Sequence, residues 1–307
     1  MIYDYKVMNE KIISRKGFSL DRLAGFCAVA DAGSIVGAAR GDVVRQSLLS
    51  RQIRELEECF GAELVKRQGR GLVLTDAGRE LAALGRSQLA ALDDFAAVSG
   101  SKPVRISLVA SETLLQWLIL PRLAKLRAAC PNAIFAVHHE DNAGIAARVQ
   151  EGIYDFGFLR RKSQRGEAGI AELGSLDYLL AAPRALVRGR DWRLESALDK
   201  LPLAVPIGGA MREALDNFMQ RRGIEHLPAL GCTSYLHAAA TLRSGVCAAV
   251  LPTLAMGEFT TDKYLTWPLT PLKLERDPVS VIWNGRNAAV RPAVGGLAGM
   301  LGSLLSF

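Results

Sequence analysis

The sequence predicts a protein that is α/β overall, with a mainly helical N-terminal part, one long linker helix and a two-lobed C-terminal region. Between Gly33 and Gly78, apolar residues recur first at helical spacing and then in two short strands. After Pro103, strands and helices alternate, and this alternation occurs twice. A chain of 307 residues is long enough for two or three units with cores of their own.

The N-terminal part is expected to begin at about Phe18, after a 17-residue extension that packs little. Apolar residues predict a first helix from Leu20 to Ala32. Ser34 can cap a short second helix, which ends at Gly41-Asp42.

The next helix is predicted from Arg45 to Phe60, and Gly61 ends it. Its apolar face carries Leu49, Ile53, Leu56 and Phe60. Its other face carries Gln46, Ser47, Ser50, Arg51 and Arg54. Polar and basic side chains backed by a buried stripe are typical of a helix that reads DNA bases.

Two short apolar strands follow, joined by a tip rich in glycine and arginine. Arg67 and Arg70 in this hairpin are suited to contact phosphate or the minor groove. Ser34 and Arg45 complete the set of candidate DNA-binding residues.

These residues follow the pattern of a known protein family. The segment is similar to the winged helix-turn-helix of LysR-type transcriptional regulators, and the likeness extends from about Phe18 to the C-terminus. The matching residues are Ala38-Ala39, Gln46, Leu49 to Ile53, Leu56-Glu57, Gly61, Arg67, Arg70 and Leu74 to Gly78. The resemblance implies a double-stranded DNA operator, a small-molecule effector, a homodimer or homotetramer, and contact with RNA polymerase.

Three positions depart from the family pattern. Arg45 stands where the family has Ser, Ser47 where it has Pro or a small residue, and Asp42 where it has an apolar residue. A buried carboxylate at position 42 would need to cap the helix or meet an arginine such as Arg45. The family's usual recognition sequence is therefore not carried over to this chain.

A long helix is expected from Thr75, its N-cap, to Val98, with Gly78 and Gly85 as weak points. Its apolar stripe comprises Leu81, Leu84, Leu89, Leu92 and Phe95. The stripe either packs on the winged unit or pairs with a second copy across a two-fold axis, and the resemblance implies the pairing.

The C-terminal region is predicted to contain parallel βαβ units in two lobes. Its first set comprises Val104–Val109, a helix over Ser111–Ala129, Ala133–His138, a helix over Ala143–Glu151, and Tyr154–Leu159. Its second set comprises Leu203–Pro206, a helix over Gly209–Arg222, Ala229–Cys232, a helix over Tyr235–Ser244, and Ala248–Leu251. A last strand, Val279–Trp283, and a closing helix, Ala288–Leu305, return to the first lobe.

The predicted domains are a winged helix-turn-helix over residues 18–74, a linker helix and hinge over 75–102, and a two-lobed region over 103–307. Lobe I takes 103–174 and 264–307, and lobe II takes 175–263. The resemblance implies an effector domain like the type 2 periplasmic binding proteins.

Small ligands bind where two lobes meet, so the candidate effector residues lie at predicted strand ends and helix starts. They are Ser111, Glu112, Thr113, Arg160, Gly208, Gly209, Ala210, Thr233 and Ser234. Ser111 either holds a ligand carboxylate or only caps its helix. The charge of Glu112 would oppose an anionic ligand if the side chain faced the cleft.

Composition and the lack of known motifs argue against several classes of protein. The net charge is +7, but residues 1–100 hold 14 basic and 13 acidic side chains, so overall charge does not argue for DNA. Five scattered cysteines form no zinc spacing, and no phosphate-binding, dinucleotide or nucleophile motif occurs. The sequence predicts no metal, no cofactor and no enzyme. The lack of an apolar run long enough to span a membrane, and of an apolar core in residues 1–18, predicts a cytoplasmic protein.

The sequence therefore predicts a regulator in which a small, anionic metabolite moves two lobes and alters DNA binding. The alternatives are a solute-binding protein, which would need an export signal, and an α/β enzyme, which would need catalytic motifs. DNA retention, periplasmic release and turnover distinguish the three.

Overall fold

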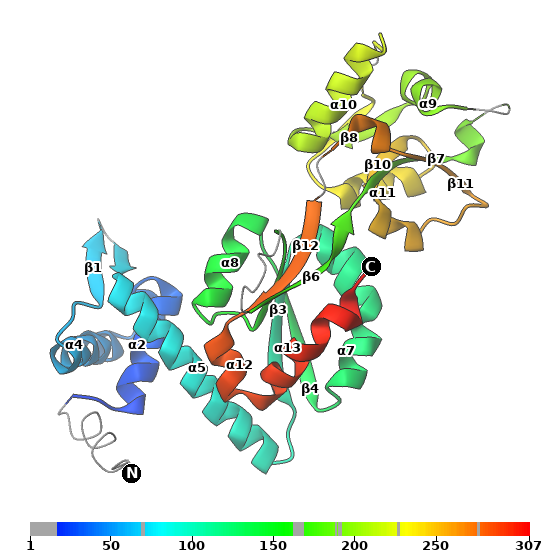
Figure 1. The fold of residues 1–307 in the computed structure, drawn as a ribbon. Helices are drawn as coiled ribbons and strands as arrows, with labels where there is room; N and C mark the ends of the chain where they lie inside the picture. Colours follow the sequence, from blue (N-terminus) through cyan, green and yellow to red (C-terminus); the bar gives the residue numbers. More distant parts are fainter. Residues whose placement is uncertain are drawn as a thin grey trace, which may run out of the picture.

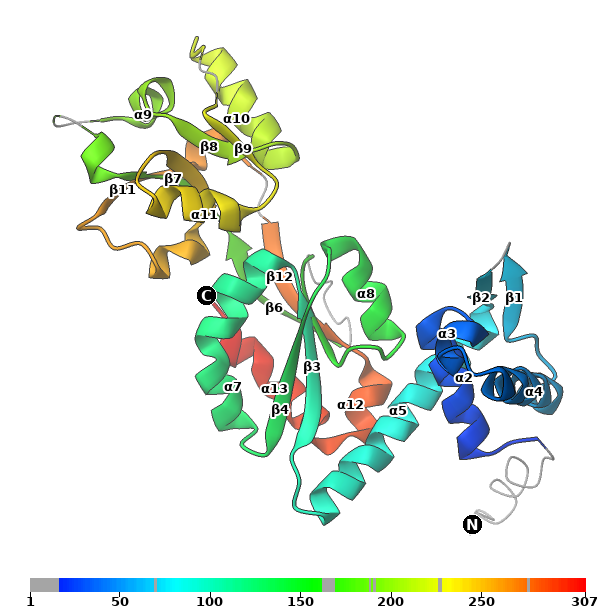
Figure 2. The same ribbon diagram turned by 180° about the vertical axis from the view of Figure 1, so that it is seen from behind.

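The computed structural model describes residues 17–68, 71–161, 169–187, 189, 192–225, 228–274 and 277–307. Figure 1 shows three parts in sequence order: a small N-terminal unit, a long helix, α5, that leads away from it, and two α/β lobes. Lobe I lies against α5, and lobe II is the part farthest from the N-terminal unit (Figures 1 and 2). No helix in the described residues is both long and apolar enough to cross a membrane.

The N-terminal unit is a winged helix-turn-helix, as predicted. It comprises α2 (Leu20–Ala32), α3 (Ile35–Ala39), α4 (Val43–Phe60), β1 (Val65–Gln68) and β2 (Gly71–Leu74). Its core joins α2 to α4 through Phe26, Leu49, Ile53 and Leu56, all buried. Gly61 ends α4 in the left-handed conformation, where glycine has no Cβ to clash.

The start of α4 was predicted two residues too late. Asp42 is the N-cap, and its Oδ1 accepts hydrogen bonds from the N–H groups of Val44 and Arg45 at 2.9 and 3.1 Å. Asp42 itself is exposed, so its charge is not buried. The cap satisfies two N–H groups that the first helical turn leaves without partners, and this extends the helix to Val43.

Helix α5 (Asp76–Ser99) has Thr75 as its N-cap, as predicted. Its two glycines, which were predicted to be weak points of the helix, are also positions of close contact. A Cβ at Gly78 would lie 2.0 Å from the carbonyl oxygen of Leu64, and one at Gly85 would lie 2.7 Å from the Sγ of Cys27. The glycines therefore let the wing and α2 approach the backbone of α5.

The buried face of α5 is made of small and polar residues, namely Gly78, Ala82, Gly85, Ser87 and Asp94. Large apolar side chains of the predicted stripe instead face solvent: Leu84, Leu92 and Phe95 are 44, 50 and 72% exposed. Packing on the winged unit therefore leaves most of the stripe uncovered in this chain.

Lobe I contains a five-stranded sheet in the order β4-β3-β5-β12-β6. The strands are β3 (Val104–Ala110), β4 (Ala133–His139), β5 (Phe156–Arg160), β6 (Ile170–Leu176) and β12 (Asp277–Trp283). Strands β3, β4 and β5 are parallel, as the βαβ pattern predicts, whereas β12 runs antiparallel to β5 and β6. Helix α8 (Asn142–Gln150) covers one face around Ile145 and Val149, and α13 (Pro292–Leu305) packs on the other.

The prediction of a single helix over Ser111–Ala129 is wrong. The segment divides into α6 (Glu112–Leu114), a π-helical turn, η1 (Leu115–Ile119), a 3₁₀ turn, η2 (Leu120–Arg122), and α7 (Leu123–Ala129). Pro121 has no N–H for the helical ladder, and the wider π turn carries Trp117 toward lobe II.

Lobe II has a second five-stranded sheet in the order β11-β7-β10-β8-β9. Its elements are β7 (Tyr178–Pro183), η3 (Arg184–Leu186), α9 (Leu194–Lys200), β8 (Leu203–Pro206), α10 (Ala210–Arg221), β9 (Leu230–Cys232), α11 (Tyr235–Arg243), β10 (Ala248–Pro252), η4 (Thr253–Gly257), β11 (Tyr264–Pro268) and η5 (Thr270–Leu272). Strands β8, β9 and β10 are parallel, as predicted, and β7 is antiparallel to both β10 and β11.

The predicted return to lobe I at residue 264 is wrong, because β11 pairs with β7 over its full length within lobe II. The chain crosses between lobes after Leu176 and again before Asp277, and these two residues are register partners of β6 and β12. The end of β6 and the start of β12 therefore lie side by side where lobe I faces lobe II, and this pair of strands is called the hinge (Figure 1).

The closing helix is also divided, into α12 (Gly285–Val290) and α13, because Pro292 cannot continue the first helix. The break places Arg291 inside the protein. Its guanidinium donates to Asp94 of α5 at 2.7 Å, to the carboxylate of Asp155, and to the carbonyl of Arg105 at 2.6 Å. Burial acts to lower the pKa of Arg291, but its bonds and charge interactions with Asp94 and Asp155 raise the pKa above its usual value.

Candidate functional site

The side chains predicted to read DNA lie on the outer side of α4. Ser47, Arg51 and Arg54 are exposed, whereas Gln46 and Ser50 are half-buried. Arg51 is 69% exposed and its Nε lies 3.7 Å from Glu55 of the next turn. Arg54 donates to the carbonyl and hydroxyl oxygens of Ser50 at 3.4 and 3.3 Å. Weak contacts of this kind can exchange for contacts to nucleic acid at little cost.

Ser34 and Arg45, two other candidates on this unit, lie at the starts of α3 and α4. The Ser34 hydroxyl accepts a 3.0 Å hydrogen bond from the Gly37 N–H and so caps α3. Arg45 meets Asp42 through its backbone N–H, and within the described chain its guanidinium makes no ion pair with that carboxylate. Arg45 is exposed at the start of α4, beside the predicted reading residues.

The wing is held to α4 by Glu57, a role that sequence reasoning missed. Its Oε1 accepts hydrogen bonds from the N–H groups of Leu64 and Val65 at 2.8 and 3.3 Å. Arg67 on β1 is exposed and pairs in register with Leu72. Arg70, the second wing candidate, lies outside the described residues.

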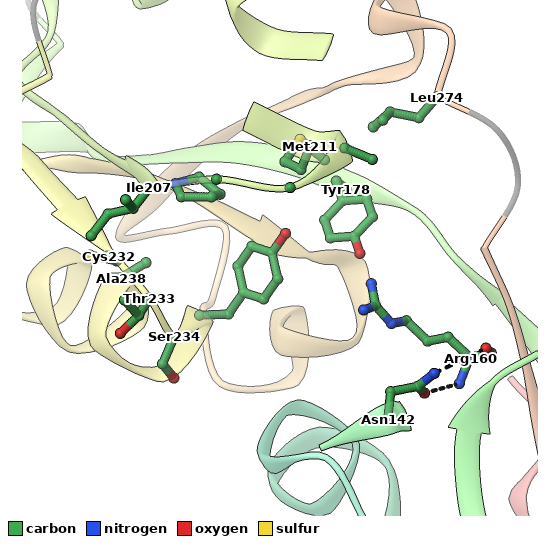
Figure 3. A pocket seen from close by; sticks show the side chains of 15 residues that line it. Asn142, Arg160, Tyr178, Ile207, Met211, Cys232, Thr233, Ser234, Ala238 and Leu274 are labelled. Atoms are coloured by element: carbon green, nitrogen blue, oxygen red, sulfur yellow. Dashed lines mark hydrogen bonds between the residues drawn. The ribbon is translucent and has the colours of Figure 1, made fainter. Parts of the chain in front are cut away.

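A cavity of about 820 Å³ opens between the lobes (Figure 3). Six candidate effector residues line it: Arg160, Gly208, Gly209, Ala210, Thr233 and Ser234. Residues that the sequence reasoning missed complete the wall: Asn142, Tyr178, Pro206, Ile207, Met211, Cys232, Tyr235, Ala238 and Leu274. Among the wall residues that the structure describes, Arg160 carries the one charged side chain.

Arg160 reaches the cavity from the end of β5 in lobe I. Its backbone N–H donates to Oδ1 of Asn142 at 2.6 Å, and Nδ2 of Asn142 donates back to the Arg160 carbonyl at 3.4 Å. Figure 3 shows its guanidinium directed toward the hydroxyl end of Tyr178 in lobe II. The Tyr178 and Tyr235 rings are 5.6 Å apart. A cation and two aromatic rings thus converge from both lobes.

Ser111, Glu112 and Thr113 do not line this cavity. Ser111 occupies the N-cap position of α6, but its side chain makes no capping hydrogen bond. The carboxylate of Glu112 accepts a 2.6 Å hydrogen bond from the hydroxyl of Ser234. Glu112 therefore bridges the lobes at the edge of the cavity and directs its charge to a hydroxyl of lobe II.

A second bridge joins the lobes at Glu258, which no sequence signal identified. Oε1 of Glu258 accepts from Nε2 of Gln116 at 2.9 Å and from Nε1 of Trp117 at 3.0 Å, both in lobe I. Oε2 accepts from Arg243 of lobe II at 2.9 Å. The Trp117 ring is 4% exposed and belongs to the apolar core of lobe II.

Four of the five cysteines have thiols whose pKa is raised by burial. No group of three or more potential metal ligands occurs among the described residues. Burial raises the pKa of the Cys27 thiol to about 11, and it also raises the pKa of Cys130, Cys232 and Cys247. A raised pKa keeps a thiol protonated and weakly nucleophilic.

Two family models match the chain. Residues 20–79 match the model described as "Bacterial regulatory helix-turn-helix protein, lysR family", and residues 100–303 match "LysR substrate binding domain". A Mycobacterium tuberculosis protein named an HTH-type transcriptional regulator is 28% identical over 304 residues, covering 92% of this chain and 94% of that protein. A Mycobacterium leprae protein named a probable hydrogen peroxide-inducible genes activator is 28% identical over 211 residues, covering 66% of this chain and 67% of that protein.

Solved structures share the fold. A full-length OxyR variant from Pseudomonas aeruginosa has a TM-score of 0.58 at 16% identity and covers 94% of this chain and 96% of its own. ArgP from Mycobacterium tuberculosis has a TM-score of 0.56 at 19% identity, and the match covers 90% of this chain and 97% of ArgP. LysG from Corynebacterium glutamicum, solved with bound effector Arg, has a TM-score of 0.55 at 18% identity. The match covers 92% of this chain and 98% of LysG.

The helix-turn-helix with its wing, the two lobes around a cavity and the two family matches agree over nearly the whole described chain. The chain belongs to the LysR family of bacterial transcriptional regulators, with the family's DNA-binding and effector-binding regions.

Proposed function

We propose that this regulator binds its operator through α4 and the wing, and that a small anionic metabolite in the cavity between the lobes controls this binding. For the DNA half of the proposal, the support is the cluster of exposed polar and basic side chains on one side of α4. Gln46, Ser47, Ser50, Arg51 and Arg54 read bases or contact phosphate, together with Ser34 and Arg45. Arg67 and Arg70 contact the backbone from the wing.

The single observation that carries the effector half is the position of Arg160. It is the one charged side chain among the described wall residues, and it projects into an 820 Å³ cavity lined by both lobes. An anion there gains a charge-assisted contact from lobe I and polar contacts from Thr233 or Ser234 in lobe II. Binding to both lobes favours one relative position of the two over others.

The exposed side chains Leu84, Leu92 and Phe95 on α5 fit pairing with a second copy. A dimer, or a tetramer built from two dimers, then places two reading helices on one operator, as a two-fold site requires. A shift of the lobes changes DNA bending or spacing, and with it the access of RNA polymerase.

A gel-shift assay tests the DNA half, using the intergenic DNA beside the gene at two salt concentrations. Gln46→Ala with Arg51→Ala should lose specific retention, since each lost bidentate base contact costs about 1–3 kcal/mol. Gln220→Ala with Arg221→Ala makes the same chemical change on exposed positions of lobe II and should bind as wild type does. Equal retention of operator and random DNA by the wild type would contradict the proposal.

Calorimetry tests the effector half, using small carboxylates paired with their neutral amides. The carboxylate of a matching pair should bind and the amide should not, and Arg160→Gln should abolish the difference. Arg222→Gln, at an exposed ion pair with Glu195, is the control. A ligand that binds wild type and Arg160→Gln equally would exclude the anionic assignment.

A further inference from the structure

The first turn of α4 carries exposed apolar side chains. Val43 and Val44 are 72 and 79% exposed. Both belong to the helix because Asp42 caps it ahead of them. Single exposed valines are common on protein surfaces, so their position decides whether these two matter.

Val43 lies on the same face of the helix as the polar residues proposed to read DNA. Val43, Ser47, Ser50 and Arg54 follow one another at spacings of four, three and four residues, which is one side of an α-helix. This side is turned away from the buried residues Leu49, Ile53 and Leu56. A helix that enters the major groove by its N-terminus presents Val43 to the bases before any of the polar residues.

Two polar side chains next to Val43, those of Asp42 and Ser47, make hydrogen bonds to the backbone of the first turn. The Ser47 hydroxyl donates to the Val43 carbonyl at 3.2 Å, and the Asp42 carboxylate accepts from two N–H groups of the first turn. A valine side chain can neither donate nor accept a hydrogen bond. In the major groove, the group that offers an apolar contact is the C5-methyl of thymine.

We infer that Val43, with Val44 beside it, recognises thymine methyl groups in the operator and so helps to set its sequence. This inference rests on the proposed binding of DNA through α4 and adds the base that the first turn selects. Along the helix, apolar recognition by the first turn is then followed by hydrogen-bonded recognition by Gln46 one turn later and by Ser50 and Arg51 two turns later.

Replacement of thymine by deoxyuridine tests the inference, because it removes only the methyl group. Footprinting of the full-length protein first locates its operator, and each thymine in a half-site is then replaced in turn. With wild type, one or two replacements should weaken binding by about fourfold each, the value of one buried methyl. With Val43→Ala, the same replacements should have little effect. Val246→Ala, a 59% exposed valine in lobe II, should behave as wild type.

The outcomes separate this inference from the function on which it rests. Specific binding that no deoxyuridine weakens, or that weakens equally in wild type and Val43→Ala, would overturn the methyl contact and leave the DNA-binding proposal intact. Lack of any specific binding by wild type would overturn both. Because Val43 is exposed and alanine favours helices, the variant should fold, and circular dichroism checks this.

Discussion

Lobe I has two interfaces of opposite character, one with the linker helix α5 and one with lobe II. At the first, Arg291 joins Asp94 of α5 to Asp155 of lobe I, and their side chains are only 6, 12 and 7% exposed. At the second, Glu112 meets Ser234 through an exposed hydrogen bond. Water can replace the second kind of contact readily but not the first, because separating buried charges leaves them without partners.

The contacts of Glu258 at the interface between the lobes are also mostly exposed to water, apart from the one with Trp117. Its ion pair with Arg243 is 31 and 52% exposed, and its bond to Gln116 is exposed. Trp117 is the exception, since its ring is buried in lobe II. We therefore expect α5 and lobe I to behave as one body, and the two lobes to shift relative to each other around β6 and β12.

The largest expected effect comes from breaking the first interface. Arg291→Met leaves two carboxylates buried without their cation and should lower the free energy of unfolding by about 3–5 kcal/mol. Arg286→Met removes an exposed pair with Glu80, whose side chains are 66 and 70% exposed, and should change it by less than about 1 kcal/mol. Both pairs join α5 to lobe I, so urea denaturation of the two variants compares a buried contact with an exposed one at the same interface, and equal losses would show that burial of the Arg291 network adds no stability.

A smaller effect is expected at the bridge between the lobes. Trp117→Phe keeps an aromatic ring but removes the N–H that donates to Glu258, which should cost about 1.5 kcal/mol of stability. The lobes should then separate more often, which small-angle scattering detects as a larger radius of gyration. Gln116→Leu removes the exposed donor to the same oxygen and serves as the comparison. An unchanged radius in Trp117→Phe would mean that its N–H does not hold the lobes together.

Removal of the charge at the cavity edge should affect ligands more than folding. Glu112→Gln keeps a hydrogen-bond acceptor for Ser234 and removes a negative charge, so an anion in the cavity should bind up to about tenfold more tightly. Stability should change by less than about 1 kcal/mol. Glu213→Gln, on the exposed side of α10, is the control. Weaker anion binding by Glu112→Gln would reverse the assigned role of this charge.

The smallest effect concerns the rate at which thiols react. Burial raises the pKa of Cys232 in the cavity wall and that of Cys27, which lies between α2 and α5, so iodoacetamide should react slowly with both at pH 7.5. Reaction should accelerate as the pH rises and the thiolate forms. In Trp117→Phe, the rate at Cys232 should increase roughly two- to fivefold, while the rate at Cys27 stays constant. Mass spectrometry follows each site, and a parallel increase at Cys27 would indicate loosening of the whole molecule.

Sequence patterns predicted the winged unit closely because its signals are local. The capping residues Ser34 and Thr75 and the terminal Gly61 act within a few residues of themselves. The start of α4 was missed because valine favours strands, and only the Asp42 cap shows that the helix includes Val43.

The lobes were harder to predict because their decisive contacts join distant residues. Nothing near β11 in sequence indicates that it pairs with β7, about eighty residues earlier, so it was assigned to the wrong lobe. In the same way, Tyr178, Tyr235 and Asn142 reach the cavity from three separate elements. The six wall residues that were predicted stand at strand ends and helix starts, which sequence patterns can identify: Arg160, Gly208, Gly209, Ala210, Thr233 and Ser234.

The close approach of Gly78 to the carbonyl of Leu64 fixes the wing to the start of α5. In the proposed dimer, joined through two copies of α5, the two wings then keep one separation and one rotation about the DNA axis. B-DNA turns once in about 10.5 base pairs, so five extra base pairs between half-sites would carry one of them to the opposite side of the duplex. In this proposed dimer, the glycine contact is expected to make binding sensitive to helical phase, so an operator with every correct base but the wrong spacing should not be bound.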